Sequence, residues 1–173
     1  MRGKVLLAAA LAAFVGSFTL APRAALAHGY VVAVRDNYAA GTIVIKTSQR
    51  RLYLMLGSGR AISYPVGVGR RGMQWSGTVS IDGKYVSPAW SPPASIKRED
   101  PRLPAVIPGG SPHNPMGVAA MTLSGGGQYA IHGTNQPSLI GGFVSHGCIR
   151  MYNADITDLF GRVSVGTTVV VTR

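Results

Sequence analysis

Prolines crowd into one internal stretch of this sequence. Eight of the eleven prolines lie between Ser87 and Pro115. Each proline removes a backbone donor, so the regular ladder of a sheet cannot continue through most of this stretch. The stretch also contains large apolar residues, including Trp90 and Ile107, which favours a packed loop over a disordered linker. We therefore predict a long ordered loop, of the kind that often forms a lid or wall of a site.

The regions on both sides of this loop carry the pattern of β-strands. Short runs rich in β-branched and aromatic residues alternate with turn residues. The expected strands are Thr42–Lys46, Arg51–Leu56, Ala61–Val66, Gly77–Ile81 before a turn at Asp82–Gly83, Gly117–Leu123, Gln128–His132 and Thr167–Thr172. Strands at such short spacing indicate a β-meander, so the predicted fold class is mainly β. His132 is expected at the end of its strand.

One short helix is expected late in the chain, over Asn153–Phe160. Asn153 is a candidate N-cap, acidic residues follow it early in the helix, and Gly161 is a candidate stop. A single helix after many strands leaves the domain mainly β.

The first 27 residues have the pattern of a secretory signal peptide. Two positive charges in Met1–Lys4 precede the apolar run Val5–Ala21, and Ala25–Ala27 offers the small-residue pattern of a cleavage site. The alternative is an uncleaved membrane anchor, because the run approaches the roughly 20 residues of a spanning helix. Pro22 favours cleavage, since it interrupts a helix where a processing enzyme needs extended chain. We predict a signal peptide at 1–27, an N-terminal segment of the mature chain at 28–41 and one globular domain at 42–173.

The chain is strongly basic. Its formal charge of +11 falls to +8 when Arg2, Lys4 and Arg23 leave with the signal peptide. This charge suits an anionic neighbourhood such as cell-wall polymer, and it speeds association with carboxylate-bearing substrates. It does not indicate a nucleic-acid partner, because the sequence lacks a long basic run with interleaved aromatics and export removes the protein from the genome. Membrane contact is expected only during export.

The only cysteine, Cys148, lies in a histidine-containing neighbourhood. A single cysteine excludes an internal disulfide and leaves an inert buried thiol, an interchain bond or a reactive thiol. His146 lies two residues before the sulfur, and His132 lies 16 residues upstream across a loop rich in Gly, Pro and Ser. A neighbouring imidazolium lowers the pKa of a thiol and holds an attacking thiolate ready. We therefore predict that Cys148 acts as a nucleophile in its thiolate form.

Acyl transfer at Cys148 also needs a proton carrier and donors for an oxyanion. We assign proton transfer to His132, because a strand end holds a side chain more rigidly than a loop holds His146. Gly147 lets the backbone approach closely, so the amides of Gly147 and Cys148 are candidate oxyanion donors. Arg150 is a surface cation by default, but its position beside Cys148 suits bidentate binding of a substrate carboxylate.

Other interpretations of these residues stay open. Each histidine taken alone is more often a structural hydrogen-bonding group, and His132, His146 and Cys148 together could instead ligate zinc. Zinc is disfavoured because no HExxH or CxxC spacing is present and the metal would mask the only thiol. We expect no metal and no cofactor, and we assign no role to His28 or His113.

Two motifs, IHGT at Ile131–Thr134 and SHGCIRM at Ser145–Met151, together resemble the L,D-transpeptidase catalytic domain, or YkuD-type, family. The resemblance covers most of the chain from about Thr42 onward. Further matching stretches are Ile43–Ile45, Tyr64–Gly69, Asn114–Gly117 and Val165–Thr167. One departure is Gln74–Gly77, where many members have a Thr-Pro-Thr-Gly-like turn.

The resemblance implies a β-sandwich-like domain with one short helix after the catalytic motif. It implies an enzyme that cuts a peptidoglycan stem peptide after its third residue, keeps the acyl part on cysteine and passes it to an amine. The family's nucleophile falls on Cys148 and its acid/base histidine on His132. Gly133 falls where the family often orients that histidine through a main-chain carbonyl. The remaining motif positions are matched by Ser145, His146, Gly147 and Arg150.

The sequence therefore predicts an exported enzyme, periplasmic or wall-associated, that acts on peptidoglycan stem peptides as an L,D-transpeptidase. Outside the cytoplasm no ATP is available to activate a carboxylate, so exchange of one amide for another through a thioester is the accessible chemistry. The acceptor stays open, and a wall-anchored lipoprotein is one candidate. One rival is an L,D-carboxypeptidase or other cysteine amidase with the same residues. Another is a non-catalytic cell-wall-binding domain with an incidental thiol.

Overall fold

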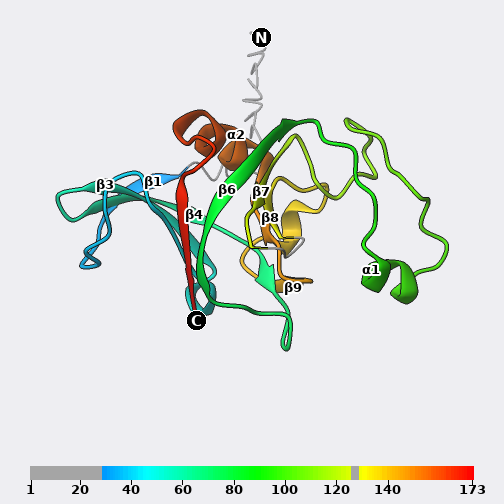
Figure 1. Cartoon of the computed structure of the whole chain (residues 1–173), viewed down its shortest axis with the longest axis horizontal. Helices are drawn as coiled ribbons and strands as arrows, with labels where there is room; N and C mark the ends of the chain where they lie inside the picture. The colour runs from blue at the N-terminus through cyan, green and yellow to red at the C-terminus, as the bar shows by residue number, and fades with distance from the viewer. Residues whose placement is uncertain (1–28, 126–128) are drawn as a thin grey trace, which may run out of the picture.

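The computed structural model describes residues 29–125 and 129–173. The predicted signal peptide at 1–27 lies outside the described residues. Within these residues the regular structure consists of eleven strands, two α-helices and two 3-10 helices, Thr47–Gln49 and Pro137–Leu139. Figure 1 shows how the main elements are arranged. The strands are β1 (Tyr30–Ala33), β2 (Ile43–Lys46), β3 (Arg51–Gly57), β4 (Arg60–Pro65), β5 (Val68–Gly69), β6 (Gly77–Val86), β7 (Ala119–Leu123), β8 (Ala130–His132), β9 (Phe143–Ser145), β10 (Ile149–Arg150) and β11 (Thr168–Thr172), and the helices are α1 (Ala94–Glu99) and α2 (Asn153–Arg162).

Nine strands form one mixed sheet in the order β1-β4-β3-β2-β11-β6-β7-β8-β10, and β5 pairs with β9 in a separate ribbon. The mainly β fold class is confirmed, as is the run of antiparallel neighbours β2, β3 and β4. The prediction of a simple meander is wrong for the sheet as a whole. The C-terminal strand β11 lies between β2, to which it is parallel, and β6, to which it is antiparallel.

Strand β6 continues through the position where the sequence suggests a turn. Its first residues pair with β11, and its last residues pair with β7. The register shifts between Ile81 and Gly83, so Asp82–Gly83 forms an irregularity within one strand rather than the end of it. Asp82 also accepts a hydrogen bond from Thr122 of β7, which ties this irregularity to the neighbouring strand. The Asp-Gly pair therefore carries the strand from one half of the sheet to the other.

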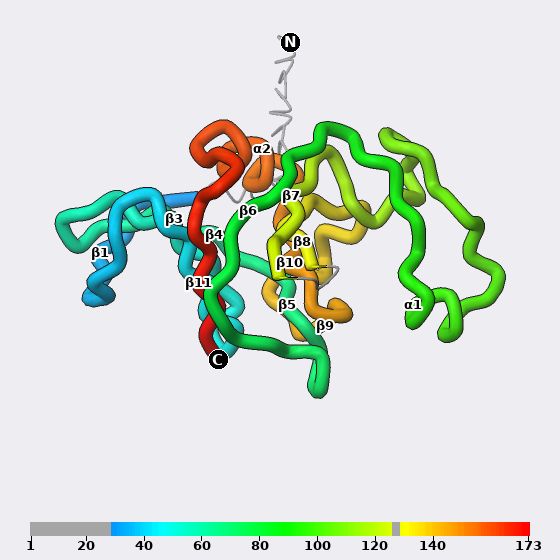
Figure 2. The backbone as a smooth tube through the Cα atoms, in the orientation of Figure 1, coloured from blue at the N-terminus to red at the C-terminus, as the bar shows by residue number. Residues whose placement is uncertain are grey.

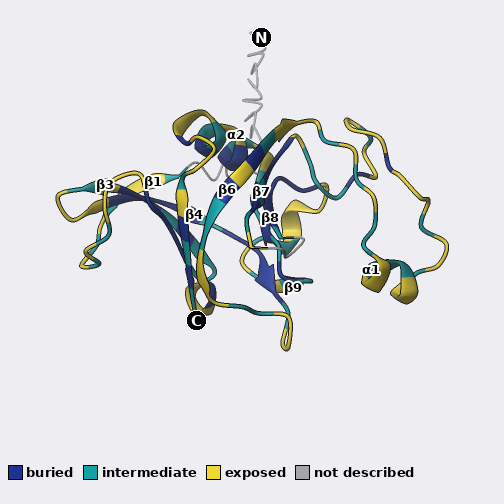
Figure 3. Ribbon diagram, in the orientation of Figure 1, coloured by how far each residue is buried: buried dark blue, intermediate teal, exposed yellow. Residues whose placement is uncertain are grey.

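One hydrophobic core joins both halves of the sheet to α2. Its buried side chains come from β2 and β3, from β7, β8 and β10, and from Ile156 and Leu159 of the helix. Each of these two helix residues is completely buried. In Figure 3 dark-blue segments lie in central strands such as β7 and β8 and in part of α2. This shared core holds β8 and β10 firmly in place.

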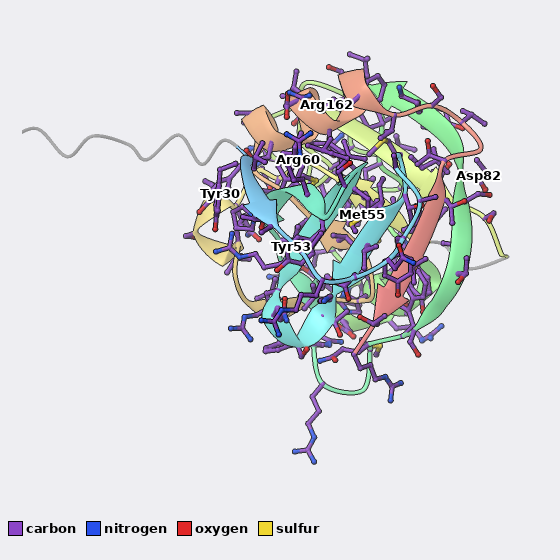
Figure 4. The ribbon with its side chains drawn as sticks, turned by 90° about the vertical axis from the view of Figure 1, so that its left-hand side faces the viewer. Tyr30, Tyr53, Met55, Arg60, Asp82 and Arg162 are labelled. Atoms are coloured by element: carbon purple, nitrogen blue, oxygen red, sulfur yellow. The ribbon has the colours of Figure 1, made fainter. Side chains whose placement is uncertain are left out.

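A smaller apolar cluster covers the other face of β2, β3 and β4. Val44, Met55 and Ala61 form it, and Tyr53 packs against it. Figure 4 looks onto this side of the molecule and shows Tyr53 and Met55 on the same strand. The N-terminal part of the described chain, with Val32 and Val34, packs over the cluster.

The proline-rich stretch forms a long excursion between β6 and β7 (Figure 2). It contains the six-residue helix α1, which the sequence did not indicate, and an isolated bridge between Trp90 and Ile107. Buried Asn114 holds the two ends of this stretch together. Its side-chain amide donates to the carbonyls of Pro88, Ile107 and Pro108. Its side-chain oxygen accepts from the amide of Met116. The predicted ordered loop is therefore confirmed, but Ile107 and Asn114 are the buried residues of the stretch and most of the rest is exposed, so the expectation of close packing is met only near these two residues.

The predicted late helix is confirmed as α2, with two corrections. Asn153 makes no capping bond, and the N-cap is Tyr152. Gly161 does not stop the helix, which ends at Arg162. Within the two described ranges, neither helix has the length and apolar character to cross a membrane.

Candidate active site

A parallel pair of short strands brings the candidate residues together. In the β8–β10 register, Arg150 lies opposite His132 and Ile149 lies opposite Ile131. Both isoleucines point into the core, where they are at most 1% exposed. Side chains alternate along a strand, so His132 and Arg150 share the opposite face. Cys148 directly precedes β10, and the charge of Arg150 acts on both Cys148 and His132. As predicted, His132 is the last residue of its strand.

His132 is a buried imidazole with its orientation fixed by the backbone. Its Nδ1 lies 2.7 Å from the carbonyl oxygen of Gly133. Burial lowers the pKa of His132 to about 4, and the positive charge of Arg150 acts in the same direction. The backbone carbonyls of Gly133 and Pro115 oppose this shift and do not overcome it. At neutral pH the ring is uncharged.

The Cys148 thiol is also neutral at rest. Burial raises its pKa, while a hydrogen bond with the backbone of Ala130 and the charge of Arg150 act in the opposite direction. This corrects the expectation of a thiolate held by a neighbouring imidazolium. Transfer out of water penalises the charged form of both groups, so the protein stabilises a thiol and a neutral imidazole instead of an ion pair.

Ser145 organises the tight turn that presents Cys148. Its hydroxyl donates to the carbonyl of Cys148 at 2.6 Å and accepts from the amide of Gly147 at 3.0 Å. Gly147 has a φ of 117°, a backbone conformation that favours glycine. The Gly147 amide is therefore engaged within the turn, and the predicted use of this amide as an oxyanion donor does not fit the structure. The Cys148 amide stays a prediction.

The side chain of Trp75 holds the turn at Gly147 in place, a role that the sequence analysis did not predict. Its indole N–H donates to the carbonyl of Gly147 at 2.9 Å, and its ring stacks on Tyr129 with centroids 4.9 Å apart. A Cβ at Gly147 would lie 2.3 Å from the ring of Tyr129. The only signal in the sequence was the departure at Gln74–Gly77 from the turn common in the family.

Asn153 links the first turn of α2 to the loop after His132. Its side-chain oxygen accepts from the amide of Thr134 at 3.0 Å and from the amide of Val118 at 3.4 Å. A cap-forming residue in the sequence thus serves a neighbouring segment instead of its own helix. This bond fixes the backbone directly after Gly133, whose carbonyl orients the imidazole.

Arg150 is a partly buried cation held by its backbone. Its amide and carbonyl pair with Gly67 at 2.8 Å in both directions. Within the described residues, its buried Nε has no hydrogen-bond partner. Burial lowers the pKa of the guanidinium. The side chain is thus placed to receive an anionic group at the face that carries His132.

The ring of His146 is engaged by a carboxylate of the proline-rich stretch, which does not support a role for it in proton transfer at the sulfur. Its Nε2 lies 3.0 Å from both carboxylate oxygens of Glu99, the last residue of α1. Glu99 also accepts a hydrogen bond from Arg70 at 2.5 Å. The proline-rich excursion therefore reaches the turn that carries Cys148.

A cavity of about 520 Å³ opens beside the loop after His132. It lies between the end of the proline-rich stretch, the Thr134–Pro137 region and the start of α2. Its lining is uncharged and includes Asn135 and Tyr152. Among the described residues, no three His, Cys, Asp or Glu side chains gather as a metal site requires.

The sequence matches one protein family and several named relatives. The profile of the YkuD family, described as the L,D-transpeptidase catalytic domain, matches residues 40–171. The chain is 43% identical over 137 residues to the Escherichia coli (strain K12) protein named "Probable L,D-transpeptidase YbiS", an alignment that covers 73% of this chain and 43% of that protein. It is 39% identical over 142 residues to the Salmonella typhimurium protein named "Probable L,D-transpeptidase ErfK/SrfK", covering 78% of this chain and 44% of that protein. The chain spans less than half the length of these relatives.

Solved structures share the fold at lower identity. The L,D-transpeptidase 3 of Mycobacterium tuberculosis superposes with a TM-score of 0.59 at 17% identity, covering 76% of this chain and 60% of that one. A mutant of the Enterococcus faecium L,D-transpeptidase superposes with a TM-score of 0.59 at 18% identity, covering 76% of this chain and 49% of that one. At this identity the likeness concerns the fold.

Proposed function

The chain belongs to the L,D-transpeptidase catalytic domain (YkuD) family, and on this basis we propose that it is a cysteine-dependent acyltransferase that acts on peptidoglycan stem peptides. The transfer takes the acyl part of a stem, cut after its third residue, to an acceptor amine. Export through the signal peptide at 1–27, to the periplasm or cell wall, is part of the proposal. A second stem and a wall-anchored lipoprotein are both candidate acceptors.

The observation that carries this proposal is the pairing of β8 with β10. The register sets Arg150 opposite His132, which supports a common face for the imidazole, the guanidinium and the Cys148 thiol. The electrostatic influence of Arg150 on both other groups supports the same arrangement. A nucleophile, a proton carrier and an anion-binding cation on one rigid face are the parts that acyl transfer needs.

His132 moves the proton in both half-reactions. The Gly133 carbonyl only accepts, so the ring proton stays on Nδ1 and Nε2 is the basic nitrogen. Because both groups are neutral at rest, Nε2 takes the thiol proton as the sulfur attacks the carbonyl carbon. The C–N bond then breaks, and the same proton leaves with the departing amine. In the second half-reaction an acceptor amine attacks the thioester, gives its proton to Nε2, and the sulfur departs and recovers that proton.

Arg150 and the catalytic turn support the charged stages. The guanidinium stabilises negative charge that develops beside the sulfur, or holds a substrate carboxylate, because its buried Nε lacks a protein partner in the described ranges. The Cys148 amide serves as an oxyanion donor. Ser145, Gly147 and Trp75 act as positioning residues, since they set the conformation of the turn. No cofactor is required by these steps.

Product analysis with defined stems tests the proposal. Purified protein is incubated with a tetrapeptide stem and an acceptor amine. The masses of the products and of the intact protein are then measured by mass spectrometry. We expect a thioester adduct on Cys148, loss of the fourth residue and a product joined to the acceptor. Cys148→Ser and His132→Gln should lose product formation, while His113→Gln, at an exposed histidine, should retain it.

The two rivals give different results in the same experiment. An L,D-carboxypeptidase or other cysteine amidase would release shortened stems without the joined product. A non-catalytic wall-binding domain would sediment with cell wall and leave the stems intact. Turnover by Cys148→Ser at the wild-type rate would overturn the cysteine mechanism.

A further inference from the structure

Glu99 is held by two side chains next to the catalytic turn. Its Oε1 accepts from Arg70 at 2.5 Å, and both of its oxygens lie 3.0 Å from Nε2 of His146. A carboxylate only accepts hydrogen bonds, so Nε2 of His146 carries the proton in this contact. The hydrogen bonds from Arg70 and then His146 hold the pKa of Glu99 below its usual range. The arrangement is that of a bound carboxylate.

The two donors belong to one fixed scaffold. Arg70 directly follows β5 and His146 directly follows β9, and these strands pair with each other. The amide of Arg70 also donates to the carbonyl of Ser145 at 2.9 Å. His146 is two residues from Cys148 in the sequence. The position of both donors is therefore set by the same turn that presents the nucleophile.

The carboxylate, in contrast, comes from a loosely attached element. Helix α1 has six residues, none of them buried, and no side-chain cap. It lies within the excursion between β6 and β7 that Figure 2 shows leaving the sheet. The side chains of Arg70, Glu99 and His146 are 41%, 47% and 22% exposed. Exposed ion pairs contribute little to stability, so a carboxylate from solution can compete with Glu99 for the same donors.

We propose that Arg70 and His146 form a carboxylate-binding subsite beside Cys148, which Glu99 fills in the unliganded protein and vacates for a free carboxylate of the substrate. This inference rests on the proposed function, since the subsite serves a peptide bound at Cys148. Two parts of the reaction carry such a group. One is the fourth residue of the donor stem, which ends in a carboxylate, and the other is an amino-acid acceptor with a carboxylate next to its amine.

Binding to an inactive protein tests the subsite separately from turnover. Calorimetry with Cys148→Ser compares a tetrapeptide stem with its C-terminal carboxamide, and an amino-acid acceptor with its amide. We expect one of the two pairs to show tighter binding of the carboxylate, by about tenfold or more, as for a hydrogen bond to a charged group. The pair that shows the preference identifies the source of the carboxylate.

Variants assign the preference to the named residues. Arg70→Gln in the Cys148→Ser background should abolish most of the preference, whereas Arg71→Gln, at the exposed neighbouring arginine, should keep it. Glu99→Gln should tighten binding of the carboxylate by about two- to fivefold, because it removes the competing internal group. Asp100→Asn is the matched control, since Asp100 pairs with Arg102.

Three results would overturn the inference: equal binding of carboxylate and carboxamide in both pairs, equal effects of Arg70→Gln and Arg71→Gln, or weaker carboxylate binding by Glu99→Gln. The wild-type protein is assayed for product in parallel. Normal product formation with any of these results rejects the subsite alone, whereas absence of product rejects the proposed function.

Discussion

Trp75 donates its indole N–H to the carbonyl of Gly147 at 2.9 Å, across 72 positions of the chain. The bond joins the segment before β6 to the residue before Cys148. The stack of Trp75 on Tyr129 adds a second contact at the same place. The conformation of the turn that carries Cys148 thus depends on a residue outside both family motifs.

Trp75→Phe should slow catalysis without unfolding the protein. The phenyl ring retains the stack, while the hydrogen bond, worth about 1 kcal/mol, is lost. We expect kcat to fall roughly fivefold, with the KM for the donor stem unchanged. Steady-state kinetics and thermal unfolding check this, and Trp75→Ala, which removes both contacts, should be worse in both measurements. An unchanged kcat for Trp75→Phe would exclude the positioning role.

Gly147→Ala should lower the free energy of unfolding much more than Gly141→Ala, although both glycines have a positive φ. Gly147 has a φ of 117° and an added Cβ would lie 2.3 Å from Tyr129. Gly141 has a φ of 90°, but a Cβ there meets no atom within 4 Å. Gly141→Ala should therefore cost about 1–2 kcal/mol of unfolding free energy from backbone strain alone. Urea unfolding should give a clearly larger loss for Gly147→Ala, and equal losses would contradict the steric account.

The low pKa of His132 predicts a loss of stability in mild acid. A histidine in the unfolded chain has a pKa near 6.5, whereas burial lowers the folded value to about 4. Between these values the unfolded chain binds more protons, so the free energy of unfolding falls as pH falls, by about 3 kcal/mol in total. Urea unfolding at about pH 7 and about pH 4.5 measures most of this fall. The fall should be smaller in His132→Gln and unchanged in His113→Gln; an identical fall in all three proteins would refute the assignment.

The raised pKa of Cys148 predicts slow alkylation at neutral pH. The thiolate is the reactive form, so iodoacetamide should label the protein slowly near pH 7 and faster as the pH is raised beyond about 9. Labelling reports on one site, because the chain has one cysteine. Arg150→Gln should slow labelling further at a given pH, since it removes the charge that lowers the thiol pKa, whereas Arg71→Gln should not. A plateau of fast labelling below pH 7 would instead reveal an ion pair.

Asn153→Ala should destabilise the loop after His132. The change leaves the buried amide of Thr134 without its acceptor, at a cost of about 1–3 kcal/mol. Asn153→Asp retains an acceptor oxygen and should lose less. Asn135→Ala, which removes an exposed bond to the carbonyl of Pro112, serves as the control in the same urea titration. A cost for Asn153→Ala no greater than that for Asn135→Ala would contradict the structural role.

Local pattern was sufficient for most of the strands. β-branched runs marked β2, β3, β4 and β11 to within one or two residues. It failed at Asp82–Gly83, because a turn and a bulge have the same local composition and only the pairing partners of β6 distinguish them. It failed for the Asn153 cap, because the competing donor at Thr134 comes from another segment.

The sequence by itself determined the mainly β class, the position of His132 at a strand end and the family motifs, because each depends on residues close together in the chain. The tertiary structure decided the rest. The protonation of Cys148 and His132 follows from burial, which is a sum over many distant atoms. The support of Gly147 by Trp75 and the contact of His146 with Glu99 join positions 72 and 47 residues apart, so no local pattern encodes them.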